Sequence, residues 1–156
     1  MSKKRGSQGR RLAGWAVMLA AVSALSGCGR LMAVVHGGPD RPAASEFGLG
    51  PRTTSTGLYR VVLEPVEPLA TRRLQKVHVR VVDTADRPVD GAEMTVDGGM
   101  PQHGHGLPTR PRMTGGLGDG RYEIDGVRFN MGGWWEFKLA ISAAAGTDSV
   151  TFNLDL

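Results

Sequence analysis

Histidine and methionine residues concentrate in one glycine-rich stretch of the sequence. Residues 98–108 read GGMPQHGHGLP, with His103 and His105 two positions apart and Met100 three positions before them. In an extended segment the two imidazoles point to the same side, and the flanking glycines let the backbone close around a small ion. Imidazole binds copper, zinc and nickel, whereas a thioether selects Cu(I). The mixed set therefore favours copper, and Cu(I) in particular.

Two further methionines extend this candidate ligand set. Met131 lies beyond the loop, and Met113 is included on proximity alone. The loop has neither a thiolate nor a carboxylate partner, so a structural zinc site is poorly supported. The same residues also fit a simpler alternative, in which the histidines form a polar turn and Met131 fills a gap in the core.

The patterns typical of enzymes are absent from the sequence. It contains no Gly-x-Ser-x-Gly motif, no phosphate-binding loop and no metalloprotease helix. Glu123 and Asp125 lie two positions apart, but no partner base accompanies them. We therefore expect a protein that is not an enzyme.

The N-terminus has the layout of an export signal. Five Lys and Arg residues precede residues 12–25, an uncharged run of 14 residues. As a helix this run would span about 21 Å, less than the ~30 Å hydrocarbon core of a bilayer. It therefore predicts a signal peptide and not a permanent membrane span.

Residues 25–28, Leu-Ser-Gly-Cys, resemble the lipobox of bacterial lipoproteins. The resemblance implies removal of residues 1–27 and acylation of Cys28, and two or three acyl chains anchor a protein stably. The alternative is an ordinary secretory signal with an incidental cysteine. We expect a domain on the periplasmic side of the cell envelope, bound to the membrane through its lipid anchor. Gly29 is not the aspartate of an inner-membrane retention signal, which favours the outer membrane.

The net charge changes when the leader is removed. The whole chain has 19 Lys and Arg against 15 Asp and Glu, a net charge of +4. The leader carries five of these cations and no acids, so the mature chain has a net charge of −1. The basic character belongs to the leader, and no nucleic-acid partner is predicted.

The remaining chain divides into a tether and one domain. Residues 28–56 are rich in Gly, Pro, Ser and Thr and predict a flexible linker that begins at the lipidated Cys28. Residues 57–156 show a hydrophobic period of two. We expect an all-β fold, a small antiparallel immunoglobulin-like β-sandwich. The expected strands are residues 57–64, 76–82, 92–96, 121–124, 134–142 and 149–154.

The two tryptophans at the start of one strand should face opposite ways. Trp135 alternates in step with Phe137 and Leu139 and is the expected core tryptophan, whereas Trp134 falls on the other face. An exposed aromatic on a sandwich face is common at protein interfaces. Trp134 is therefore a candidate interaction surface.

Two motifs resemble one known family. MPQHGHG and the later GDGRYEIDGVRFNMGGWWEFKLAI resemble the YtkA-like and FixH-like domains, over about residues 57–156. The positions that match are Met100, His103, His105, Met131 and Trp135. The resemblance implies an exported or membrane-tethered immunoglobulin-like sandwich, associated with copper handling or oxidase assembly. FixH itself has a membrane-spanning helix where this chain has a lipobox.

Two functions of different classes follow. The first is copper binding or copper delivery by an anchored lipoprotein, with a copper-requiring protein as the partner. The second is a metal-free interaction module that assists assembly of a membrane protein complex, with Trp134 and the histidine loop as the contact surface.

Overall fold

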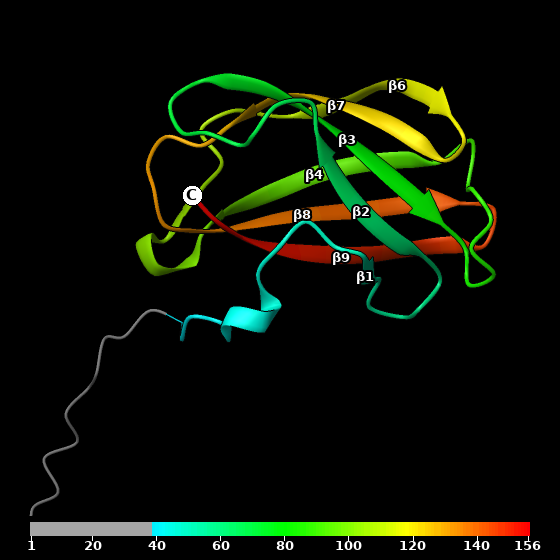
Figure 1. Cartoon of the computed structure of the whole chain (residues 1–156), viewed down its shortest axis with the longest axis horizontal. Helices are drawn as coiled ribbons and strands as arrows, with labels where there is room; N and C mark the ends of the chain where they lie inside the picture. The colour runs from blue at the N-terminus through cyan, green and yellow to red at the C-terminus, as the bar shows by residue number, and fades with distance from the viewer. Residues whose placement is uncertain (1–38) are drawn as a thin grey trace, which may run out of the picture. The chain divides into compact units, whose positions relative to one another are not determined.

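Within residues 39–156, nine strands form two antiparallel sheets that pack face to face (Figure 1). The computed structural model describes residues 39–156, so the signal peptide, Cys28 and the first part of the predicted linker lie outside the described residues. One sheet has the order β1-β2-β3-β7-β6 and the other β5-β4-β8-β9. The predicted all-β sandwich is confirmed.

The larger sheet contains β1 (Arg52–Thr53), β2 (Arg60–Pro65), β3 (Leu74–Val82), β7 (Arg121–Arg128) and β6 (Arg112–Gly118). The smaller sheet contains β5 (His105–Gly106), β4 (Glu93–Met100), β8 (Trp134–Ala143) and β9 (Gly146–Asp155). Two short 3-10 helices, η1 (Ala44–Glu46) and η2 (Pro101–His103), complete the described elements. No helix in the described part of the chain has the length and apolar character needed to cross a bilayer.

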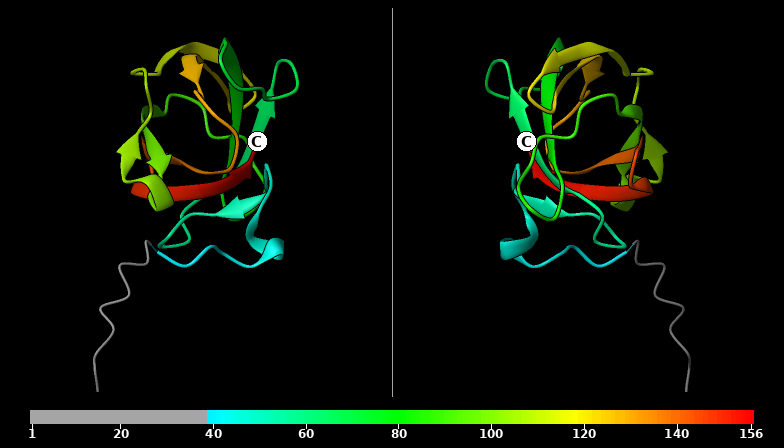
Figure 2. Two further views of the ribbon diagram at one scale, coloured as in Figure 1. Left: turned by 90° about the vertical axis from the view of Figure 1, so that its left-hand side faces the viewer. Right: turned by 90° about the vertical axis from the view of Figure 1, so that its right-hand side faces the viewer.

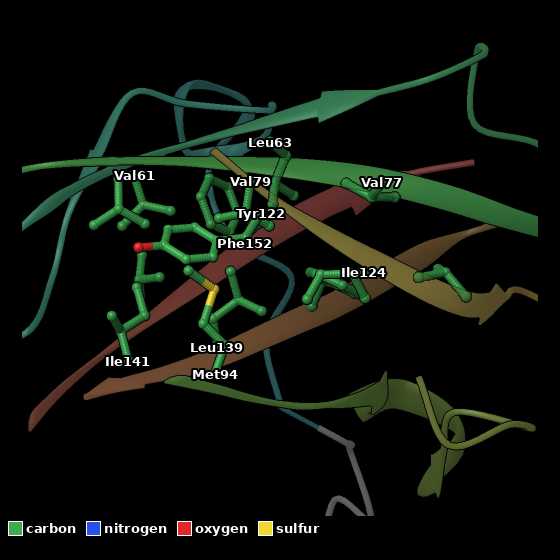
Figure 3. Close-up of a cluster of buried hydrophobic side chains, with 14 of the residues drawn as sticks. Val61, Leu63, Val77, Val79, Met94, Tyr122, Ile124, Leu139, Ile141 and Phe152 are labelled. Carbon is green, nitrogen blue, oxygen red and sulfur yellow. The ribbon is translucent and has the colours of Figure 1, made fainter. Parts of the chain in front are cut away.

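The core lies between the two sheets, where alternate residues of each strand meet (Figure 3). On β3, Val77, Val79 and Val81 are buried, as the period of two predicts. On β8, Trp135 and the alternate residues that follow it are buried in the same way. Burial of these apolar side chains on one face of each sheet is the main stabilising term of the fold.

A β-bulge in β7 shapes the end of the sandwich that carries the histidine loop. The register between β3 and β7 shifts between Gln75 and Val77, and Gly126 has φ 82° at the bulge. A bulge adds one residue to one strand and so changes which residues face the core. Val127 and Phe129 are buried beyond it, and the connection to β8 begins there.

Residues 39–56, assigned by composition to the flexible linker, are packed against the sandwich. Gly48 N donates to Asn153 O at 3.0 Å, and Leu63 N donates to Leu49 O at 2.7 Å. Figure 2 shows this cyan segment along the side of the sandwich beside β9. Edge strands carry unpaired backbone groups, and this segment satisfies some of those of β9 and β2. The predicted start of the domain at residue 57 is corrected accordingly.

Candidate metal site

The histidine loop is a tight reversal between two strands of the smaller sheet. β4 ends at Met100, η2 follows, and Gly104 takes a left-handed conformation with φ 67° before β5 returns along β4. Backbone hydrogen bonds close the loop, from Gly104 N to Met100 O and from Leu107 N to Gly98 O, both at 3.0 Å. The backbone around the two histidines is therefore held from both sides.

The structure brings His103 and His105 together on the surface. Their ring centres are 5.9 Å apart, with an angle of 31° between the planes, and both residues are exposed. Two imidazoles that bind one ion at about 2 Å per metal–nitrogen bond have ring centres roughly 5 to 6.5 Å apart. The observed spacing fits that range, so this pair meets the first geometric requirement of a shared metal ion.

A backbone carbonyl orients the second imidazole. His105 Nδ1 lies 3.1 Å from Gly106 O. The tautomer that donates Nδ1–H to this carbonyl leaves the Nε2 lone pair available for a ligand bond. Metal-binding histidines usually have such an outer hydrogen bond, which fixes the ring and raises its basicity. In that tautomer, Nε2 is the nitrogen through which His105 would bind a metal ion.

Trp135 contacts both the histidine loop and the segment that contains Met131. Its ring meets the His105 ring edge to face, with centres 5.7 Å apart, and meets Phe129 in the same way at 5.2 Å. Its Nε1 donates to Met131 O at 3.0 Å. The sequence pattern placed Trp135 in the core but did not assign it to the site, because alternation along one strand says nothing about which loop covers a buried ring.

The methionines separate into exposed and buried groups. Met131 is 39% exposed, and its backbone is held by Trp135. Met100 is only 2% exposed, and its Cε packs so close to Gly133 that a Cβ there would lie 3.0 Å away. Met113, on β6 of the other sheet, is partly buried against the core. Among the methionines of residues 39–156, Met131 is thus the one with an exposed side chain.

Met100, predicted as a metal ligand, is buried in the core, although it also lines the surface hollow beside His105. The side chains of Met94 and Met100 are six positions apart on β4, so the period of two points both inward. The predicted strand ended at residue 96, and the inward direction was lost with that boundary. Extending it through the two glycines would have placed Met100 correctly.

Acidic side chains do not complete the site. Within residues 39–156, no group of three or more His, Cys, Asp or Glu side chains lies close enough together to hold a metal ion. Glu136 lines the same surface hollow as His105, but its carboxylate is 2.7 Å from the Lys138 ammonium. The donors that the described structure brings together at the surface are therefore the two imidazoles, while Met131 is exposed on the neighbouring loop.

Trp134 does not form the exposed interaction surface that the alternation predicts. It is 3% exposed, and its Nε1 donates to Asn153 Oδ1 at 3.0 Å. Asn153 Nδ2 in turn donates to Glu46 O at 3.4 Å, so the segment containing η1 covers this side of the sheet. Trp134 is a packing residue.

Comparisons with known proteins identify one family. A family model described as YtkA-like matches residues 55–140, which include the histidine loop and Trp135. Among solved structures, the ZirS C-terminal domain matches with 14% identity over 96% of this chain and 97% of that chain, with a TM-score of 0.38. No curated protein matches.

Proposed function

We propose that this chain, which belongs to the YtkA-like family, is a lipid-anchored extracytoplasmic protein that binds copper through His103 and His105. The observation that carries the proposal is the 5.9 Å separation of the two exposed rings on a loop closed by backbone hydrogen bonds. Such a loop holds two nitrogen donors in place before any ion arrives, which lowers the entropic cost of binding.

The donor set favours Cu(I) over other ions. Cu(I) is satisfied by few ligands and accepts thioether sulfur, which zinc sites in proteins rarely use. His105 would bind through Nε2, His103 through its ring, and Met131 would supply the sulfur. Cu(I) would be bound as the ion to be transferred, and no reaction is proposed at the site.

The exposure of the site supports a role in transfer. His103, His105 and Met131 are all at the surface, so a second protein could replace these ligands one at a time. A closed site would instead hold its ion for structural purposes. The proposed partner is therefore a copper-requiring protein or a membrane complex that receives the ion.

The proposed anchor is an acylated Cys28, with the outer membrane as the favoured location. Intact mass measurement of the protein purified from membranes should show loss of residues 1–27 and addition of acyl chains. Cys28→Ser should retain the precursor mass and block acylation. An unmodified Cys28 in the mature protein would reject this part of the proposal.

The metal site is tested by anaerobic Cu(I) titration against a chromogenic chelator. The His103→Ala/His105→Ala variant should lose at least about 100-fold in affinity, because it removes both nitrogen ligands. Met131→Ala should lose less, and Met100→Leu should bind as the wild type does. His78→Ala, on β3 and away from the loop, is the matched control. Equal affinity of the double variant and the wild type would reject the site.

A further inference from the structure

Four arginines without acidic partners surround the second half of β7. Arg72, Arg110, Arg112 and Arg128 are all exposed, and none forms an ion pair within residues 39–156. We call these four residues the arginine cluster. Arg112 lies opposite Asp125 in the sheet without forming an ion pair with it, and the four arginines produce a local positive field on a mature chain whose other charges are net negative.

Strand pairing explains why these arginines lie close together. Arg128 on β7 pairs with Leu74 on β3, and Arg112 on β6 pairs with Asp125 on β7. Arg72 N donates to Phe129 O at 2.6 Å. Three strands therefore bring residues that are far apart in sequence to one end of the larger sheet.

Neighbouring contacts add Arg110 and an apolar residue to this surface. Thr109 Oγ1 donates to Gly126 O at 2.7 Å, which places Arg110 beside the bulge of β7. Leu74, the strand partner of Arg128, is 65% exposed. The surface thus combines cations with a protruding apolar side chain.

The opposite end of the sandwich has a different charge arrangement. Its arginines are mostly paired with carboxylates, at Arg60–Asp86, Arg87–Asp83 and Arg121–Glu64. A positive charge beside a carboxylate attracts a distant anion only weakly, because the two fields cancel. Arg80 at that end also lacks an ion pair, but four such arginines lie together at the end that carries the arginine cluster.

The chain enters the domain at this same end. Arg41 forms an ion pair with Asp155 at 2.7 Å, and Asp155 pairs with Trp134 at the start of β8. Cys28 precedes Pro39 by 11 residues, which can span at most about 40 Å. A lipid on Cys28 would therefore hold this end within that distance of the bilayer. This step rests on the proposed lipid anchor.

The histidine loop belongs to the same end. Trp135 contacts both His105 and Phe129, and the Phe129 carbonyl accepts the hydrogen bond from Arg72 N. His105 and the arginine cluster are thus linked through Trp135 and Phe129, and the anchor entry lies beside the start of β8, the strand that carries Trp135. A surface that faces the membrane would carry the metal site with it.

We infer that the arginine cluster and Leu74 dock the domain on anionic phospholipid headgroups, with the histidine loop at the membrane surface. Each cation near an anionic bilayer contributes about fivefold to the binding equilibrium, so four give up to several hundredfold. The attraction weakens with salt, because the Debye length falls from ~10 Å at 0.1 M to ~3 Å at 1 M. The domain should release from the surface in high salt while its anchor remains.

The test is hydrogen–deuterium exchange of the full chain in nanodiscs of phosphatidylcholine, with and without phosphatidylglycerol. We expect slower exchange at residues 70–74, 109–113 and 127–131 only in the anionic discs and only at low salt. Residues 83–87 and 144–146, in turns at the opposite end, should exchange equally in both. Equal exchange of all these segments in the two lipids would overturn the inference.

Two charge-matched variants identify the responsible residues. The first carries Arg72→Gln, Arg110→Gln, Arg112→Gln and Arg128→Gln, and it should lose the protection. The second carries Arg60→Gln, Arg80→Gln, Arg87→Gln and Arg121→Gln, and it should keep it. Equal loss in both, or protection by soluble poly-glutamate but not by anionic discs, would reject lipid as the partner. Cu(I) affinity and intact mass, measured on the same samples, report separately on the metal site and the anchor.

Discussion

Gly99 is the point where the histidine loop lies closest to the strand that carries it. Gly99 pairs with Gly106, and a Cβ at Gly99 would lie 2.3 Å from His105 O and 2.8 Å from Gly106 Cα. Ordinary contacts of a Cβ begin at 3.4 Å, so the Gly99→Ala substitution requires β5 to move by 3.4 − 2.3 = 1.1 Å. The substitution removes no candidate ligand and leaves both histidines in the chain.

The cost of this movement should be moderate. β5 is held to β4 by a short ladder, flanked by the Gly104–Met100 and Leu107–Gly98 hydrogen bonds. Each hydrogen bond contributes about 1 kcal/mol net, so losing one or two lowers the free energy of unfolding by about 1–2 kcal/mol. This agrees with the ~1–3 kcal/mol typical of overpacking. The core between the sheets should remain intact.

The effect on copper should be larger than the effect on stability. His105 moves with β5, so the 5.9 Å ring separation changes while the ring keeps its chemistry. Disturbing the groups that orient a metal ligand typically costs 10–100-fold in affinity. We expect a loss of this size for Cu(I) in the Gly99→Ala variant.

Urea unfolding and Cu(I) titration of the same samples measure the two effects. Gly106→Ala is the matched control, because its Cβ would meet Gly98 O at 3.4 Å and nothing closer. The control should retain both stability and affinity within about twofold. Wild-type affinity in Gly99→Ala would refute the argument that the close approach of β4 and β5 positions the site, and so would a collapse of the fold.

Three further predictions concern residues around the site and the opposite turn. Asp148 accepts hydrogen bonds from Thr56 N, Leu58 N and Ser149 N. Burial alone would raise the pKa of Asp148. The hydroxyls of Thr54 and Thr56, together with the backbone donors, instead hold that pKa well below its usual range. A carboxyl group whose pKa is lowered on folding stabilises the fold at pH values above its unfolded-state pKa of about 3.9. This stabilisation is lost as the pH falls from there towards the folded-state pKa. Asp148→Asn should therefore lower Tm at pH 7, and the difference from the wild type should narrow below about pH 4. Trp135→Phe removes the hydrogen bond from Nε1 to Met131 O and the edge contact with His105. It should lower the free energy of unfolding in urea by about 2–3 kcal/mol and weaken Cu(I) binding. Unchanged Cu(I) binding would exclude Trp135 as a support of the loop. Asn153→Ala leaves the buried Trp134 Nε1–H without its partner, at a cost of about 1–3 kcal/mol, measured by urea unfolding; a cost near zero would show that water reaches this ring.

Strands with an uninterrupted period of two could be predicted from the sequence, and those without it could not. β3 and β8 have regular alternation and were located within two residues of their observed ends. β6 reads RMTGGLG, and its pairing with β7 shifts register twice. Glycines remove the apolar side chains that mark a strand, and bulges break the alternation. β1 and β5 have two residues each, too few to show a period.

The proximity of His103 and His105 was predicted, but for a different geometric reason. An extended segment would place residues i and i+2 on one side. In the structure His103 ends η2, His105 begins β5, and Gly104 between them is left-handed. The reversal brings the rings together across a turn. The sequence shows the glycine that permits the turn. It does not show whether the φ of that glycine is positive or negative, because glycine adopts either sign readily.

The prediction of an exposed Trp134 and the prediction of a linker that ends at residue 56 differ from the structure for one reason. Alternation along β8 correctly puts Trp134 on the face away from the core, but a face away from the core is exposed only if nothing covers it. Here Phe47 bridges to Asn153, and Glu46 O accepts a hydrogen bond from the Asn153 side chain that also holds the indole. The covering segment looks like linker by composition, because its glycines and prolines carry little apolar surface. Its attachment comes from backbone hydrogen bonds to the open edges of β9 and β2, and composition does not report those.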